Sequence, residues 1–258
     1  MTPRFMISVD SATTLEGYVG NGLSQAELNA ELGSSQSYEL TRSTCGSVTT
    51  PFPNATSTLV FSDYNALVAT LNAGVPAGVK AVVYDPEAWS FTPVAQQENP
   101  GLYEKLAAEA AHAHGLELIA TPAVNLATVS GASTNESKYD QFLADGYAAA
   151  AAKYADVYEI QAQGLEGDTA EYQQFLAKAI AQATAANPDV TVYAGLSTSA
   201  NGNAVTSAQL FQDVLATEHE VSGYWLNIAG PSPYSPNVQQ SHPEVAVGLL
   251  NDVWLAWS

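Results

Sequence analysis

Short runs rich in β-branched residues alternate with longer Ala- and Leu-rich runs along the chain, and this alternation restricts the fold more than any other feature. Strands are predicted over residues 5–9, 79–84, 116–121, 157–161, 191–196 and 224–228, with weaker candidates at 38–42 and 58–61. Regular alternation implies parallel strands joined by right-handed crossovers. Eight such strands favour a closed barrel, so we predict a single α/β domain over residues 1–258, a (β/α)8 barrel of the TIM type.

Helix starts between these strands are marked by pairs in which Ser, Thr or Asp precedes Glu or Gln by three residues. The pairs are Ser24 with Glu27, Asp168 with Glu171, Thr206 with Gln209, and Ser241 with Glu244. A further helix is expected over residues 136–154, which contain five consecutive alanines. The glycine-rich phosphate loops of nucleotide-binding folds and the Gly-x-Ser-x-Gly turn of many hydrolases do not occur in the sequence, so these classes are disfavoured.

Acidic residues greatly outnumber basic ones, with 26 Asp and Glu against 7 Lys and Arg and a formal net charge of −19. A field of that sign repels phosphate backbones and anionic lipid head groups, so we expect neither nucleic acid nor a membrane as partner. No run approaches the roughly 18 apolar residues of a membrane helix. The single cysteine, Cys45, excludes an internal disulfide and a cysteine-only metal site. Nothing in the sequence specifies an oligomeric state.

The composition also bears on location, because few lysines and many Ala, Ser, Thr, Gln and Asn residues accompany the acidity. Such a composition suits an exported bacterial protein. The sequence begins Met1-Thr2-Pro3 and enters a predicted strand at once, without a signal peptide. We therefore expect a secreted protein whose leader has been removed, with the cytoplasm as the alternative location.

Polar side chains gather where the predicted strands end. In a parallel barrel the carboxyl ends of all strands meet at one face, which carries the active site. Alternation along the strands places these side chains toward the interior near that face: Asp10, Asp85, Glu87, Thr121, Glu159, Gln161, Gln163, Trp225 and Asn227. Amides and carboxylates hydrogen-bond hydroxyl groups, and an indole stacks on a sugar ring. The sequence therefore predicts a neutral carbohydrate, a small molecule or an oligosaccharide, as substrate.

Two stretches contain the candidate catalytic groups. The interior face of residues 79–87 turns from apolar to acidic at Asp85 and Glu87, and Trp89 follows in the next loop. Along residues 157–163 one face carries three polar residues, beginning with Glu159. A buried polar group left unsatisfied costs about 1–3 kcal/mol, which indicates a cavity or complementary partners there. We expect Glu87, Asp85 and Glu159 to be catalytic and Trp89 to wall the pocket.

The residues Asp85-Pro86-Glu87 at the end of the predicted fourth strand resemble the last part of the Asp-x-x-Asp-x-Asp-x-Glu motif of family 18 glycoside hydrolases, the chitinase-like (β/α)8 barrels. This resemblance implies that Glu87 is the general acid and that Asp85 orients a substrate acetamido group, which acts as internal nucleophile. It also implies that Trp225 forms the floor of a sugar subsite. The two earlier acids of the motif fall on Lys80 and Val83.

Three functions remain open at this point. The leading one is a glycosidase in which Glu87 protonates the glycosidic oxygen, while Asp85 or Glu159 stabilises the oxocarbenium charge or activates water. Because two acids of the motif are missing, a catalytically inactive carbohydrate-binding or interaction barrel is the alternative. A Mg²⁺-dependent lyase or isomerase, with Asp10 joining these three acids as oxygen ligands, is the third. No spacing specifies a metal site, and we predict neither a metal nor a cofactor.

Overall fold

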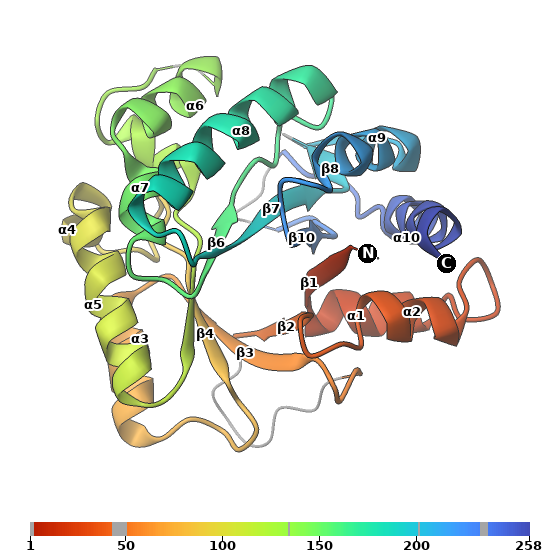
Figure 1. Cartoon of the computed structure of the whole chain (residues 1–258), viewed down its shortest axis with the longest axis horizontal. Helices are drawn as coiled ribbons and strands as arrows, with labels where there is room; N and C mark the ends of the chain where they lie inside the picture. Colours follow the sequence, from red (N-terminus) through yellow and green to blue (C-terminus); the bar gives the residue numbers. More distant parts are fainter. Residues whose placement is uncertain (1–2, 43–50, 134, 201, 233–236) are drawn as a thin grey trace.

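The computed structural model describes residues 3–42, 51–133, 135–200, 202–232 and 237–258, so Cys45 lies outside the described residues. Eight parallel strands close into a barrel with helices packed around its outside (Figure 1). The strands are β1 (Arg4–Ser8), β2 (Tyr38–Thr41), β3 (Thr56–Phe61), β4 (Ala81–Tyr84), β5 (Glu117–Ala120), β6 (Val157–Ile160), β7 (Thr191–Ser197) and β10 (Gly223–Asn227). They pair in this order, and β10 pairs with β1 to close the barrel. The predicted (β/α)8 barrel is confirmed.

The helices follow strands in the sequence, with α10 after the last strand, and cover the outer face of the barrel (Figure 1). They are α1 (Val9–Glu16), α2 (Gln25–Glu31), α3 (Tyr64–Ala73), α4 (Val94–Glu98), α5 (Pro100–Ala113), the 3₁₀ helix η1 (Val124–Thr128), α6 (Asn135–Ala144), α7 (Tyr147–Ala152), α8 (Thr169–Ala186), α9 (Ser207–Thr217) and α10 (Pro243–Trp257). A small antiparallel hairpin, β8 (Ser199–Ala200) with β9 (Asn203–Ala204), follows β7. Among the described residues, none of the helices has the length and apolar character needed to cross a membrane.

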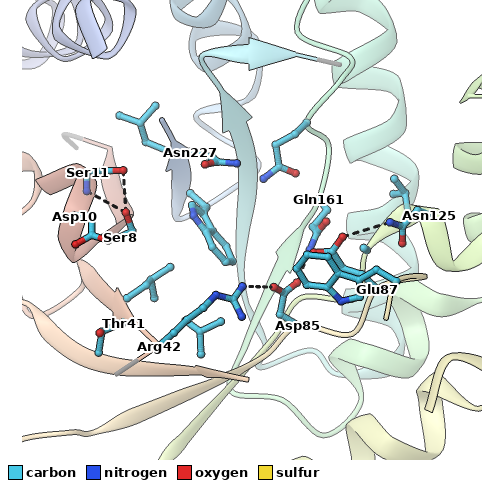
Figure 2. Close-up of a pocket in the computed structure, with 18 of the residues that line it drawn as sticks. Ser8, Asp10, Ser11, Thr41, Arg42, Asp85, Glu87, Asn125, Gln161 and Asn227 are labelled. Carbon is cyan, nitrogen blue, oxygen red and sulfur yellow. Dashed lines mark hydrogen bonds and ion pairs between the residues drawn. The ribbon is translucent and has the colours of Figure 1, made fainter. Parts of the chain in front are cut away.

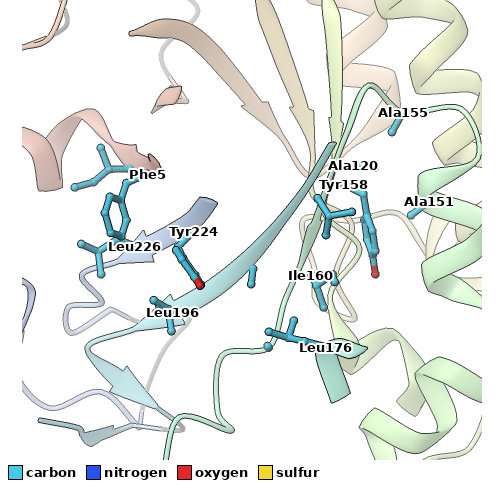
Figure 3. Packing of buried hydrophobic residues seen from close by; sticks show 14 of the residues in the cluster. Phe5, Ala120, Ala151, Ala155, Tyr158, Ile160, Leu176, Leu196, Tyr224 and Leu226 are labelled. Atoms are coloured by element: carbon cyan, nitrogen blue, oxygen red, sulfur yellow. The ribbon is translucent and has the colours of Figure 1, made fainter. Parts of the chain in front are cut away.

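Alternate residues of each strand pack on opposite faces, as the period of two predicts. Met6, Val83, Ile119 and other inward-facing residues form an apolar cluster inside the barrel. Outward-facing residues belong to a second, larger cluster beneath the helices. Figure 3 shows Tyr158 of β6 in this layer, beside Ala151 of α7. Full burial of such a side chain stabilises the fold by roughly 1.5–3 kcal/mol, so the strands' alternating pattern is what fixes both layers.

Capping residues begin several helices where the sequence predicts. Ser24 and Thr206 form full capping boxes with the glutamate or glutamine three residues later, and Asp168 accepts hydrogen bonds from two backbone N–H groups of α8. The predicted start at Ser241 is wrong. Helix α10 begins at Pro243 without a side-chain cap, because Glu244 contacts the His242 ring instead, at 2.8 Å between Oε1 and Nδ1.

The helix expected over residues 136–154 is divided into α6 and α7 in the structure. Gly146 lies between them with a φ of 71°, in the left-handed region. Glycine adopts this conformation without the steric cost that a Cβ imposes, and it commonly ends a helix. The alanine-rich composition therefore predicted helical structure correctly but concealed the break.

Gly223, at the start of β10, provides a test of how tightly the barrel closes. A Cβ at this position would collide with the backbone oxygen of Arg4 in the neighbouring strand and with the ring of Tyr193. We expect Gly223→Ala to lower the free energy of unfolding by about 1–3 kcal/mol in urea titrations, because neither backbone nor ring moves freely. Gly167→Ala is the matched control, since nothing lies within 4 Å of its Cβ position. Equal stability of the two variants would contradict the tight closure.

Candidate functional site

A cavity of about 620 Å³ opens at the carboxyl ends of the barrel strands (Figure 2). Its lining comes from strand ends and from the loops that follow them, which is where (β/α)8 barrels place their chemistry. Most of the residues predicted for the site line this cavity: Asp10, Asp85, Glu87, Trp89, Gln161, Gln163, Trp225 and Asn227. Glu159 does not line it. The convergence of side chains from separate strands is therefore present in the structure.

Asp85 follows β4 directly and is buried at the floor of the cavity. The Arg42 guanidinium, at the end of β2, reaches its Oδ2 at 3.3 Å (Figure 2). Its Oδ1 accepts hydrogen bonds from the Gln161 amide at 2.9 Å and the Thr121 hydroxyl at 3.3 Å. Burial raises the pKa of Asp85, whereas the Arg42 charge and these hydrogen bonds favour its ionised form.

Glu87 lies two residues further along, half-buried in the loop after β4. The Asn125 amide of η1 donates to its Oε2 at 3.3 Å (Figure 2), and its backbone N–H donates to the Thr92 hydroxyl at 3.0 Å. Burial and the neighbouring Asp85 charge raise the pKa of Glu87 to about 8. At neutral pH its carboxyl group is therefore largely protonated.

Asp85 and Glu87 form an acid pair whose members differ in their hydrogen-bond donors. Asp85 receives a guanidinium, an amide and a hydroxyl group, whereas one side-chain amide donates to Glu87. Donors of this kind stabilise a carboxylate, so the negative charge of the pair belongs on Asp85 and the proton on Glu87. Two acids with different environments and a proton on only one of them are what acid catalysis near neutral pH requires.

Two tryptophans contribute apolar surface to this polar cavity. Trp225 on β10 packs against the barrel's interior cluster and remains half-exposed in the cavity. The Trp89 indole N–H donates to the Thr92 hydroxyl at 3.1 Å, and its ring meets Phe91 edge-on with centroids 5.0 Å apart. Since the Thr92 hydroxyl also donates to the backbone oxygen of Ser62, the loop carrying Trp89 is tied to the end of β3.

Gln163, which follows β6, has room for its side chain because the neighbouring strand β7 carries a glycine beside it. A Cβ at Gly195 of β7 would collide with the Gln163 side-chain amide. The backbone oxygen of Gln163 accepts a hydrogen bond from the Tyr139 hydroxyl at 2.9 Å, which joins this loop to α6. Gln163 and the exposed Asn227 at the end of β10 thus present amide groups to the cavity.

Asp10 lines the cavity from a different element than the sequence predicted. Strand β1 ends at Ser8, whose hydroxyl caps α1 by accepting from the Ser11 backbone N–H at 3.1 Å (Figure 2). Asp10 therefore lies in the first helical turn and is exposed at the rim. The prediction that Asp10 continues the strand is wrong, because the Ser8 cap ends β1 and α1 begins at Val9.

Glu159 is fully buried inside the barrel and lies outside the cavity lining. Neither of its carboxyl oxygens has a hydrogen-bond partner among the described residues. Burial, with a smaller contribution from the Asp85 charge, raises the pKa of Glu159 well above its ordinary value. Burial without a hydrogen-bond partner favours the neutral form of this side chain. The sequence predicted that Glu159 would act on a substrate, but the side chain does not line the cavity.

Several residues that shape the site were missed in the sequence. Arg42, Asn125 and Lys138 line the cavity, and Thr92 organises the loop that carries Glu87. Arg42 ends a predicted strand, and only 7 Lys and Arg occur in the chain, so a cation at a strand end was an available signal. Asn125 and Lys138 lie on helices beyond the strand ends, where no periodicity indicates which side chains face inward.

The acids at the site do not assemble into a metal centre. Within the part of the chain that the structure describes, no three His, Cys, Asp or Glu side chains are grouped to hold a metal ion. Of the four acids considered as Mg²⁺ ligands, Glu159 is outside the cavity, and Figure 2 places Asp10 across the cavity from Glu87. The four acids named for the Mg²⁺-dependent alternative are therefore not brought together in one cluster.

No protein-family model and no curated protein sequence matches the chain. Among solved structures it is similar to triosephosphate isomerase from Bartonella henselae, with a TM-score of 0.50 and 8% identity over 99% of this chain and 100% of that chain. It is also similar to a GH128 (subgroup III) curdlan-specific exo-β-1,3-glucanase from Blastomyces gilchristii, with a TM-score of 0.50 and 12% identity over 87% of this chain and 93% of that chain. At such identities the likeness shows the barrel fold alone.

The burial of Glu159 leads to a prediction about stability. In the unfolded chain a glutamate has a pKa of about 4.3, whereas burial raises the pKa of Glu159 well above the ordinary value in the folded protein. As the pH rises above the pKa that Glu159 has in the unfolded chain, the unfolded state loses this proton and the folded state does not. The native protein therefore loses stability. Glu159→Gln removes this loss, so we expect its free energy of unfolding to exceed the wild-type value near pH 8 and to match it near pH 4.

The control is Glu98→Gln, the same change on the exposed side of α4. Urea titrations at both pH values measure the difference. A Glu159→Gln variant that is less stable than wild type by the same amount at both pH values would show that the carboxyl group is ionised or specifically bonded in the fold.

Proposed function

We propose that this protein is a glycoside hydrolase in which Glu87 is the general acid. The observation that carries the proposal is the acid pair at the cavity floor, in which Glu87 has a pKa of about 8 beside an Asp85 held by Arg42. Cleavage of a glycosidic bond needs a proton on the leaving oxygen at the pH where the enzyme works. A half-buried, protonated carboxyl facing a cavity of this size meets that need.

In this mechanism Asn125 holds the Glu87 carboxyl through its amide, and Glu87 transfers its proton to the glycosidic oxygen as the bond to the anomeric carbon breaks. The anomeric centre gains positive charge in the transition state. Asp85 is fixed by three side-chain donors and needs no reorganisation to stabilise that charge, which is the general basis of electrostatic catalysis.

The family 18 resemblance assigns Asp85 a different task, the orientation of a substrate acetamido group. Both Asp85 oxygens already accept hydrogen bonds from Arg42, Thr121 and Gln161. Three of the roughly four acceptor positions of the carboxylate are thus occupied, and we assign Asp85 the electrostatic role. The substrate of the proposed enzyme is therefore not restricted to N-acetylated sugars.

Binding of a sugar is supported by the rest of the lining. Trp225 and Trp89 offer flat apolar faces, and Gln163 and Asn227 offer amide groups to hydroxyls. The Gln161 amide nitrogen instead donates to Asp85 and to the backbone oxygen of Thr121. Sugar sites combine these two elements because a pyranose ring has apolar faces and a polar perimeter. The same lining would serve a barrel that binds carbohydrate without cleaving it, and variants of Glu87 distinguish the two cases.

Glu87→Gln removes the transferable proton while it keeps the side chain's shape. We expect the variant to lose about 10²- to 10⁴-fold in kcat on the glycoside that the wild type cleaves, with sugar binding retained. Reducing-end release from a panel of oligosaccharides measures turnover, and thermal shift with the same panel measures binding. Glu98→Gln on α4 is the control and should behave as wild type.

Wild-type binding of a sugar without any turnover, unchanged in Glu87→Gln, would overturn the hydrolase and establish the non-catalytic carbohydrate-binding barrel. Turnover that survives in Glu87→Gln would place the general acid elsewhere.

The pH profile provides an independent test of the acid pair. Because Glu87 must be protonated, activity should fall as the pH rises through about 8. The Asp85 charge raises the pKa of Glu87, so Asp85→Asn should move this basic limb of kcat/KM to lower pH, besides lowering the maximum. Asp189→Asn, an exposed position before β7, is the matched control and should leave the limb in place. If the basic limb of kcat/KM lies at the same pH in Asp85→Asn as in the wild type, a group other than Glu87 controls it.

A further inference from the structure

Basic residues are rare in this chain, yet two of the 7 Lys and Arg line the same cavity. Arg42 is one, and its charge is balanced by Asp85 at 3.3 Å. Lys138 on α6 is the other. It is half-buried, and none of the ion pairs in the described part of the chain includes it. The cavity therefore contains a positive charge that no described carboxylate neutralises.

Lys138 lines the cavity from α6 and lies beside the Tyr139 ring. Its ammonium lies 5.0 Å from the centroid of the Tyr139 ring, and the Tyr139 hydroxyl donates to the backbone oxygen of Gln163. Helix α6 also packs on η1, which carries Asn125. Figure 2 places Asn125 and Asp10 at opposite sides of the cavity. Among the described acids that line the cavity, the exposed Asp10 thus lies on the side opposite Asn125, whereas Glu87 is bonded to Asn125.

Among the described residues no carboxylate pairs with this half-buried ammonium, and burial lowers the pKa of Lys138 from its ordinary value. A neutral residue at this position would avoid the cost of burying a charge. An anionic group bound beside Lys138 would recover the lost solvation through a charge-assisted hydrogen bond. A ligand with an anionic group would therefore explain why one of the few basic residues of this chain lines the cavity.

We propose that the substrate of this barrel is an acidic oligosaccharide whose carboxylate or sulfate group binds Lys138, in the subsite bordered by Gln163 and Asn125. This inference rests on the proposed glycosidase function and replaces the neutral substrate that the composition of the strand ends predicted. Lys138 acts on specificity, and the proton transfer remains with Glu87.

The net charge of −19 does not conflict with this assignment. The field of the whole protein is screened over about 8–10 Å at ordinary ionic strength, whereas the contact with Lys138 acts at a few ångströms. The general field slows the approach of an anion, so added salt should speed its association before it weakens the contact itself.

The test uses sets of oligosaccharides that share linkage, length and configuration and differ only at C6, as hydroxymethyl, carboxylate or sulfate ester. The sets cover gluco, galacto and manno configurations in α and β linkage, and calorimetry measures the affinities. We expect the wild type to bind an acidic member of one set about tenfold or more tightly than its neutral counterpart. The carboxylate and sulfate members show which of the two anions is bound.

Lys138→Gln should weaken binding of that acidic member about 10- to 100-fold and leave the neutral one nearly unchanged, since it removes one charge-assisted hydrogen bond. Lys138→Arg keeps the charge and should retain most of the preference. Lys178→Gln, at an exposed position of α8, alters the net charge equally and should have no effect. Equal affinity for acidic and neutral members in the wild type, or equal losses for both in Lys138→Gln, would overturn the inference.

Turnover measured on the same sets separates this inference from the proposed function. Glu87-dependent cleavage of neutral members, without preference for acidic ones, would reject the acidic substrate and keep the hydrolase. Lys138-dependent binding of an acidic member that the wild type never cleaves would reject the hydrolase and keep the anion subsite. Failure of every member to bind would reject both.

Discussion

Closure of the barrel through the pairing of β1 with β10 is the constraint on which the rest of the structure depends. A closed parallel sheet satisfies its own backbone groups and leaves side chains as the only contents of the interior. Apolar residues such as Met6 and Val83 fill the middle of the barrel. Polar side chains that need solvent or a ligand gather where the strands end, and this concentrates the chemistry at one face. The position of the cavity is thus a result of closure.

Scarcity of cations determines what happens to the acids that point inward. Arg42 reaches Asp85, and that single ion pair gives the two acids at the cavity floor different environments. Glu159, deeper in the barrel, has no such partner among the described residues, and burial raises its pKa well above the ordinary value. Burial favours the neutral form of all three acids, whereas donors that reach a carboxyl group favour its ionised form, so the environments of Asp85, Glu87 and Glu159 differ according to the donors that reach them.

Strand order and most helix starts were predictable because alternation and capping are periodic or local properties of a sequence. The interior faces of β4 and β6 followed from the period of two, and Asp85, Glu87 and Gln161 are placed accordingly. Depth was not predictable: Glu159 shares a face with Gln161 but lies below the cavity, because depth depends on the stagger between strands. Asn125 and Lys138 lie on helices after strand ends, and no pattern specifies how those loops turn.

Besides Glu159, the acids Glu31 and Glu104 are also buried without hydrogen-bond partners for their carboxyl oxygens among the described residues, and burial raises the pKa of both. The folded protein near neutral pH is therefore less negative than the formal −19, and these carboxyl groups ionise when the chain opens. Unfolding thus releases protons and increases the molecule's charge. A more highly charged unfolded chain repels its own segments and other copies, so the acids hidden in the native barrel become a safeguard against aggregation once the barrel is lost.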